Sequence, residues 1–136
     1  MFDIATLIQD YSSNPVNNYE MKDFDISYQE GNPVCGDGIN VFLKIENNKI
    51  KEFSFTGDTS MITTTAVSLL AEEIQGIDLQ EILAWDLDFM REELGMQVSS
   101  RRNRAVLLGL LATRNAIHKY INDGKIDDFD DLGLDD

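Results

Sequence analysis

The chain has 136 residues, a length that suits one domain. Its 25 acidic and 11 basic residues give a net charge of −14, which argues against nucleic acid as a partner, because phosphate binding needs a basic surface. The longest apolar run, residues 106–112, is much shorter than the roughly 20 residues that a membrane-spanning helix needs. The first residues lack the pattern of a secretory signal, so we expect a cytoplasmic protein that does not enter a membrane.

The chain opens with a segment of helical periodicity. Apolar residues recur at roughly helical spacing over residues 2–12. Pro15 ends this helix, because the residue before a proline avoids the α region. Apolar and polar residues then alternate over 24–28 and again over 39–45, a pattern typical of strands with one buried face.

A third strand is predicted over residues 49–55, where Phe53 and Phe55 lie on one face. Asn47 and Asn48 separate it from the strand before, and asparagine tolerates the positive φ of a tight hairpin turn better than most residues. The three strands therefore predict an antiparallel meander with one face available for a core.

The remainder of the chain is predicted to be helical, with segments over residues 62–74, 79–83, 86–94 and 103–121. Asp78, with Glu81 three residues later, forms an aspartate variant of the capping box. The last segment is so apolar that we expect it to be central and buried, and Gly124 stops it. Strands first and helices after predict an α+β fold, with a three-stranded antiparallel sheet packed on one face by helices.

The end of the chain differs in composition from the part before it. Residues 127–136 are mostly aspartate, with Phe129, Leu132 and Leu134 among them. We expect a disordered, solvated tail over residues 125–136 that follows a domain over residues 1–124. The alternative is a docking peptide for a basic partner.

One motif points to a known family. The segment Asn-Pro-Val-Cys-Gly-Asp at residues 32–37 opens the second strand. It resembles the N-P-x-C-G-D element that carries the first cluster ligand in the NifU/IscU-type iron–sulfur scaffolds. Less specific matches occur in the family's order at residues 11–17, 53–62, 75–81 and 100–107. The resemblance covers most of the chain, and it implies the scaffold fold.

The resemblance also assigns candidate site residues. Family members bring three cysteines together, with an aspartate and sometimes a histidine nearby. Cys35 and Asp37 match the first cysteine and the aspartate, whereas Asp58 and Arg104 occupy the other two cysteine positions. Asn103 lies where some members have histidine. Cys35, Asp37 and Asp58 are therefore the metal or sulfur-acceptor candidates, with Asn103 and Arg104 lining the site.

The chemistry of these residues limits what they can bind. Iron–sulfur clusters prefer thiolates, and zinc takes about four ligands from Cys, His and carboxylate. Arg104 cannot be a ligand, because its guanidinium has no lone pair to offer. We expect it to occupy the former metal position and to form a fork with Asp58, Asp37 or both. Cys35 has the alternative of being a small buried hydrophobe.

The resemblance implies a role in iron–sulfur cluster assembly. In that family a cysteine desulfurase delivers sulfur to the scaffold, so the expected partners are a desulfurase or other assembly proteins. With one of three family cysteines kept, we expect a degenerate scaffold that accepts sulfur or iron. An iron–sulfur cluster or iron is the implied cofactor, and a zinc site using Cys35, Asp37 and Asp58 is a weaker alternative.

A second function belongs to a different class. The fold can serve as a metal-free interaction or regulatory module that docks on a desulfurase or another assembly factor. An enzyme is not expected, because the sequence has no Ser-His-Asp set and no phosphate-binding loop. The single histidine, His118, is predicted to lie on the surface, far down the last helix from Cys35.

Overall fold

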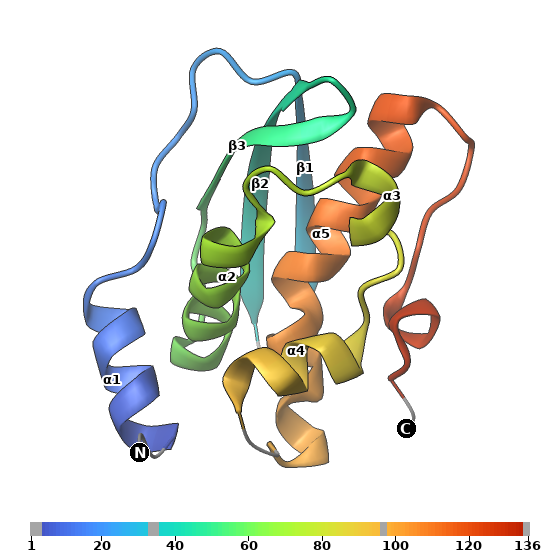
Figure 1. Cartoon of the computed structure of the whole chain (residues 1–136). Helices are drawn as coiled ribbons and strands as arrows, with labels where there is room; N and C mark the ends of the chain where they lie inside the picture. Colours follow the sequence, from blue (N-terminus) through green and yellow to red (C-terminus); the bar gives the residue numbers. More distant parts are fainter. Residues whose placement is uncertain (1–3, 33–35, 96–97, 135–136) are drawn as a thin grey trace.

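The computed structural model describes residues 4–32, 36–95 and 98–134. Its elements along the chain are α1 (Ile4–Ser13), β1 (Ile26–Asn32), β2 (Asp37–Glu46), β3 (Lys49–Thr56), α2 (Met61–Ile74), α3 (Leu79–Ile82), α4 (Leu87–Leu94), η1 (Ser100–Arg102), α5 (Asn103–Ile121) and η2 (Phe129–Leu132) (Figure 1). Within these residues no helix is both long and apolar enough to cross a membrane.

The three strands form one antiparallel sheet in the order β1-β2-β3, which confirms the predicted meander. Asn47 and Asn48 make the β2–β3 turn with φ of 54° and 64°, the left-handed region that a tight hairpin requires. The first strand begins at Ile26, later than predicted, and continues to Asn32. Phe24 lies before the first residue that pairs with β2. The ring of Phe24 packs against Phe42 instead, with 5.4 Å between centroids.

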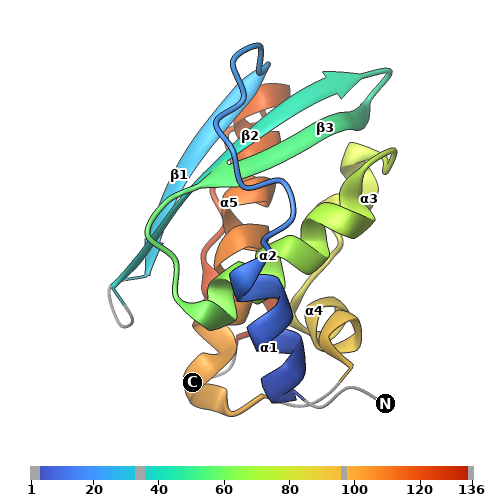
Figure 2. The ribbon, with the colours of Figure 1, turned by 90° about the vertical axis from the view of Figure 1, so that its left-hand side faces the viewer.

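Helices cover one face of the sheet. α5 packs against β1, β2 and α2, and it runs along the sheet as the central helix (Figures 1 and 2). Leu107 and Leu108 of α5 are fully buried, as are Leu43 and Phe53 of the sheet. The two helices approach closely at Gly109, where an added Cβ would lie 2.7 Å from Cγ2 of Val67. A glycine at this position therefore sets the distance between α5 and α2.

The C-terminal segment is ordered over residues 127–134, and the prediction of a disordered tail is wrong for this part. Asp128 caps η2 and forms a capping box with Asp131. Leu132 and Leu134 are 0% and 6% exposed and belong to the hydrophobic core. Burial of these two leucines holds the segment, although its acidic composition is typical of a solvated end. The division of the chain at residue 124 stays a prediction.

Candidate functional site

The motif that carries the resemblance borders a polar cavity of about 300 Å³. The cavity lies where the start of β2 meets the loop between β3 and α2. It is lined by Gln29, Gly36, Asp37, Gly38, Ile39, Asn40, Gly57 and Asp58. The structure therefore brings together two of the predicted site residues, Asp37 and Asp58, at one cavity.

Two glycines hold these chain segments together. Gly57 has φ of 133°, and a Cβ at this position would lie 2.2 Å from the carbonyl oxygen of Gly38. The amide of Gly38 donates to the carbonyl oxygen of Asp58 at 3.0 Å. Only glycine allows this close approach of backbone to backbone, so the two glycines hold the start of β2 against the loop that carries Asp58.

Two hydrogen bonds join the side chain of Asp37 to the start of α2. Its side chain is buried, and its carboxylate accepts hydrogen bonds from the backbone N–H of Ser60 and from Oγ1 of Thr63, the latter at 2.7 Å. Ser60 is itself the N-cap of α2 and accepts from the N–H of Thr63. A carboxylate at a helix N-terminus is favourable for the helix. Asp37 thus already has a structural role, and each of its oxygens has a partner.

Asp58 has a different environment. It is exposed, and within the described part of the chain its carboxylate makes no hydrogen bond or ion pair. Its carboxylate is therefore available to a ligand at the mouth of the cavity. Cys35 lies outside the described residues, so its position beside Asp58 stays a prediction.

Asn103 and Arg104 begin α5. Asn103 is 3% exposed, and its Oδ1 has no hydrogen-bond partner among the described residues. The guanidinium of Arg104 lies over the ring of Phe129, with 5.0 Å from Cζ to the ring centroid, a cation–π arrangement. The predicted fork is wrong, because Asp37 binds Ser60 and Thr63 and no ion pair between described residues joins Arg104 to Asp37 or Asp58.

The described residues do not by themselves complete a metal site. Within them no group of three or more His, Cys, Asp or Glu side chains is arranged to hold a metal ion. Of the predicted candidates, Asp37 has both oxygens engaged and Asp58 offers one carboxylate. A thiolate-preferring cluster would thus need Cys35 and ligands from elsewhere.

A buried charge network that the sequence did not indicate lies at the other end of α5. His118 is 5% exposed, so the prediction of a surface histidine is wrong. Its Nδ1 lies 2.7 Å from Oδ2 of Asp123, and its Nε2 lies 2.9 Å from Oδ2 of Asp127. The same Asp127 oxygen lies 2.9 Å from Nε of Arg114, an ion pair that lacks the alignment of a hydrogen bond. Nη1 of Arg114 donates to the carbonyl oxygen of Trp85 at 3.0 Å.

The pKa values of two neighbouring carboxyl groups are shifted. Burial raises the pKa of Glu30, although a hydrogen bond from Asn115 at 3.0 Å opposes the increase. The pKa of Asp123 is lowered, first by a hydrogen bond from the amide of Lys125 and also by His118. Only the i, i+4 spacing of Arg114 and His118 on one helix could have indicated the network from the sequence.

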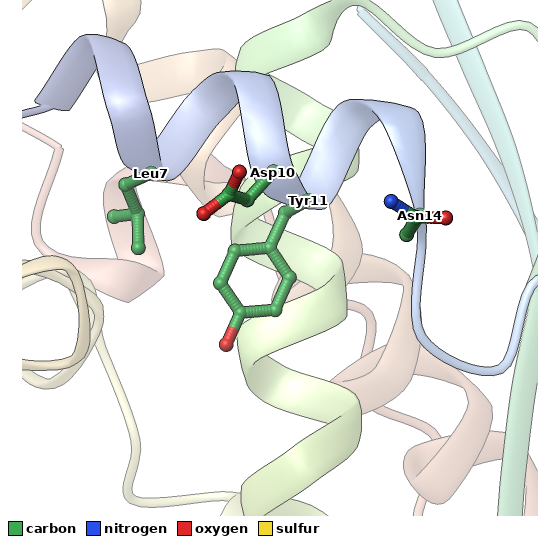
Figure 3. A pocket seen from close by; sticks show the side chains of 4 residues that line it. All are labelled: Leu7, Asp10, Tyr11 and Asn14. Atoms are coloured by element: carbon green, nitrogen blue, oxygen red, sulfur yellow. The ribbon is translucent and has the colours of Figure 1, made fainter.

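A second cavity, of about 370 Å³, lies along α1. Leu7, Asp10, Tyr11 and Asn14 line it from one face of the helix (Figure 3). Oη of Tyr11 donates to Oε1 of Glu72 at 2.6 Å, and this hydrogen bond raises the pKa of Tyr11 to about 12. The hydrogen bond of Tyr11 fastens α1 to α2, and the described residues that line the cavity include none of the predicted site residues.

Comparisons with known proteins find similar sequences over most of the chain. A family model described as the NifU-like N terminal domain matches residues 4–126. The iron–sulfur cluster assembly scaffold proteins IscU 1 and IscU 2 of Archaeoglobus fulgidus are each 33% identical to the chain over 128 residues, which is 92% of this chain and 82% of each relative. The zinc-dependent sulfurtransferase SufU of Bacillus subtilis is 28% identical over 78 residues, or 57% of this chain and 52% of that protein.

Solved structures show the same fold at low identity. A NifU-like protein from Brucella abortus superimposes with a TM-score of 0.72 at 15% identity, over 87% of this chain and 94% of that chain. The FiSufU protein of Fervidobacterium islandicum AW-1 gives a TM-score of 0.70 at 18% identity, over 82% of this chain and 93% of that chain. The predicted α+β scaffold fold is thereby confirmed.

Proposed function

We propose that this chain, which belongs to the family of NifU-like N-terminal domains, acts in iron–sulfur cluster assembly as a scaffold-like protein of the cytoplasm. The observation that carries the proposal is the family match over residues 4–126, together with relatives named as assembly scaffolds that are 33% identical. The polar cavity beside Asp37 and Asp58 supports it, because it lies at the family's ligand motif.

In this proposal Cys35 is the residue that accepts sulfur or iron. A thiolate is the soft donor that iron and sulfur chemistry requires, and Cys35 is the chain's one cysteine. Asp58 adds an exposed carboxylate at the mouth of the cavity. The guanidinium of Arg104 has no lone pair that could bind a metal, so a complete cluster would need ligands from a partner or a second copy. The cluster is then a transient cargo, and a cysteine desulfurase is the expected sulfur donor.

Sulfur transfer gives a direct test. The purified chain is incubated with a cysteine desulfurase and L-cysteine, and mass spectrometry then counts added sulfur atoms per chain. We expect one added sulfur atom on the unmodified chain and none on Cys35→Ser, with Asp58→Asn as a control that keeps the thiol. Anaerobic reconstitution with iron and sulfide follows, read by iron and sulfide content. A chain that acquires neither sulfur nor iron would remove the acceptor role.

A metal-free role is the second candidate. It is favoured by Asp58 and Arg104 at two cysteine positions, and by the cation–π contact that holds Arg104 on Phe129. In that case the chain is an interaction or regulatory module that docks on a desulfurase or another assembly factor. Co-purification of a desulfurase with the chain, unchanged by Cys35→Ser, would support this role over the acceptor role.

Zinc binding is a third proposal. The relative SufU is named a zinc-dependent sulfurtransferase, so both zinc and a transfer activity occur among similar proteins. Cys35, Asp37 and Asp58 are the candidate ligands here, but Asp37 would have to release Ser60 or Thr63 first. Elemental analysis of the purified chain, with Cys35→Ser as the control, tests for zinc. The expectation that the chain is not an enzyme stays a prediction.

A further inference from the structure

The basic residues of this acidic chain are unevenly placed. Between Glu93 and Asp123 the chain has no acidic residue, yet it holds five of the 11 lysines and arginines. Three of them, Arg101, Arg102 and Arg104, fall within four positions at η1 and the first turn of α5. On a chain of net charge −14, this arginine patch is a local region of opposite sign.

Two of these arginines are available to a partner. Arg101 and Arg102 are exposed, and within the described part of the chain neither makes an ion pair or a hydrogen bond through its side chain. Arginine presents a planar fork of five donors, a geometry that matches carboxylates and also stacks on aromatic rings. Exposed arginine is moreover a residue type enriched in protein interfaces.

The third arginine shows which chemistry this surface accepts. Arg104 lies over Phe129, which is flanked by Asp127, Asp128 and Asp130 in the C-terminal segment. This segment descends alongside α5 toward its first turn (Figure 1). It is anchored along α5 by the burial of Leu132 and by the ion pair of Asp127 with Arg114, which lies further along the helix. The chain therefore already places an acidic, aromatic segment against one edge of the patch.

We propose that Arg101, Arg102 and Arg104 form a docking surface for an acidic segment of another protein that carries an aromatic ring. The partner's carboxylates pair with Arg101 and Arg102, and its ring competes with Phe129 for Arg104. The chain's own segment then restricts access to Arg104 until a partner displaces the ring. This surface goes beyond the proposed role in cluster assembly and needs neither a metal nor Cys35.

Peptide binding to the full chain, measured without metal by fluorescence anisotropy, tests the proposal. The probe is a labelled synthetic peptide with the sequence of residues 127–136, and its comparison peptide has alanine in place of phenylalanine. We expect R101A/R102A to bind the probe about tenfold more weakly, because two exposed charge contacts are lost. K22A/K119A removes the same charge from exposed lysines elsewhere and should leave the affinity unchanged.

Phe129→Ala separates docking from general attraction between charges. If the ring of Phe129 occupies Arg104, its removal should strengthen binding of the phenylalanine peptide by about threefold, the size of a weak exposed cation–π contact. The alanine peptide should show no such gain. Circular dichroism confirms that each variant is folded.

Three outcomes would overturn the proposal. The first is equal binding by R101A/R102A and K22A/K119A, and the second is weaker or unchanged binding by folded Phe129→Ala. In the third, sedimentation shows that the chain self-associates and that R101A/R102A makes it monomeric. The occupant of the patch would then be a second copy rather than another protein.

Discussion

Replacing Asp37 with alanine should destabilise the fold even when no metal is present. The buried carboxylate accepts from the N–H of Ser60 and from Oγ1 of Thr63. A hydrogen bond to a charged group contributes about 1.5–3 kcal/mol, and the cost of burying the charge offsets part of two such bonds. We therefore expect the free energy of unfolding to fall by about 2–4 kcal/mol, which for a domain of this size lowers Tm by roughly 10 °C.

Asp58→Ala is the matched control for this prediction. It removes a carboxylate from the same cavity, but that carboxylate is exposed and makes no hydrogen bond within the described residues. Its effect should stay within about 0.5 kcal/mol. Urea unfolding followed by circular dichroism in the presence of a chelator measures both variants. If Asp37→Ala were no less stable than Asp58→Ala, the structural role of Asp37 would be refuted.

Three further predictions concern other parts of the fold. Gly109→Ala forces a Cβ to within 2.7 Å of Val67, so it should lower the free energy of unfolding by about 1–3 kcal/mol, and Val67→Ala should restore part of this loss in a double-mutant cycle. The pKa of Tyr11 is about 12, so this phenol should stay protonated at a pH where an ordinary tyrosine ionises, and ultraviolet titration of Glu72→Gln should show the pKa falling toward its usual value. Asp127→Asn leaves Arg114 and His118 without their shared carboxylate and should cost about 2–4 kcal/mol, with faster amide exchange over residues 129–134.

Each of these predictions has an outcome that would contradict it. Additive effects of Gly109→Ala and Val67→Ala would show that the two residues do not clash. A Tyr11 transition that does not move in Glu72→Gln would remove the hydrogen bond as its cause. Asp130→Asn removes the same charge from an exposed position of the C-terminal segment. If it loosened the segment as much as Asp127→Asn, the buried network would not be the anchor.

The sheet could be predicted from the sequence because its signals are local. Alternation of apolar and polar residues sets which face is buried, and Asn47 and Asn48 carry the backbone preference that closes the hairpin. Family resemblance added the position of Asp37 and Asp58 at one cavity, which no local pattern contains. It also assigned Asp37 as a ligand candidate, and the structure adds what no carboxylate pattern reveals: Asp37 accepts from the N–H of Ser60, the N-cap of α2, and from Oγ1 of Thr63.

The C-terminal segment was missed for a related reason. Its capping box at Asp128 and Asp131 has the same sequence spacing as the box predicted at Asp78 and Glu81. At Asp78 the side chain accepts from the N–H of Gln80 instead, whereas Asp128 and Asp131 each accept from the other's backbone N–H. Aspartates at these positions indicate a solvated end by composition. Order comes from contacts with distant residues, such as the pairing of Asp127 with Arg114, and such pairs leave no periodic signal in one sequence.

The resemblance implies that Asp58 and Arg104 stand at two of the family's cysteine positions, and contacts between protein groups fix the chain around the first of them and at the start of α2. The backbone contact between Gly57 and Gly38 fixes the loop that carries Asp58, and the bonds from Asp37 fix the start of α2. If a metal bound here supplied part of the free energy of folding, an arginine at position 104 would remove one of its ligands, and the fold would lose that contribution. The stability of the apo chain should consequently be the same in Cys35→Ser and in the unmodified chain, within about 0.5 kcal/mol. A larger loss in the presence of a chelator would show that the thiol itself is part of the packed structure, and would return Cys35 to the role of a buried hydrophobe.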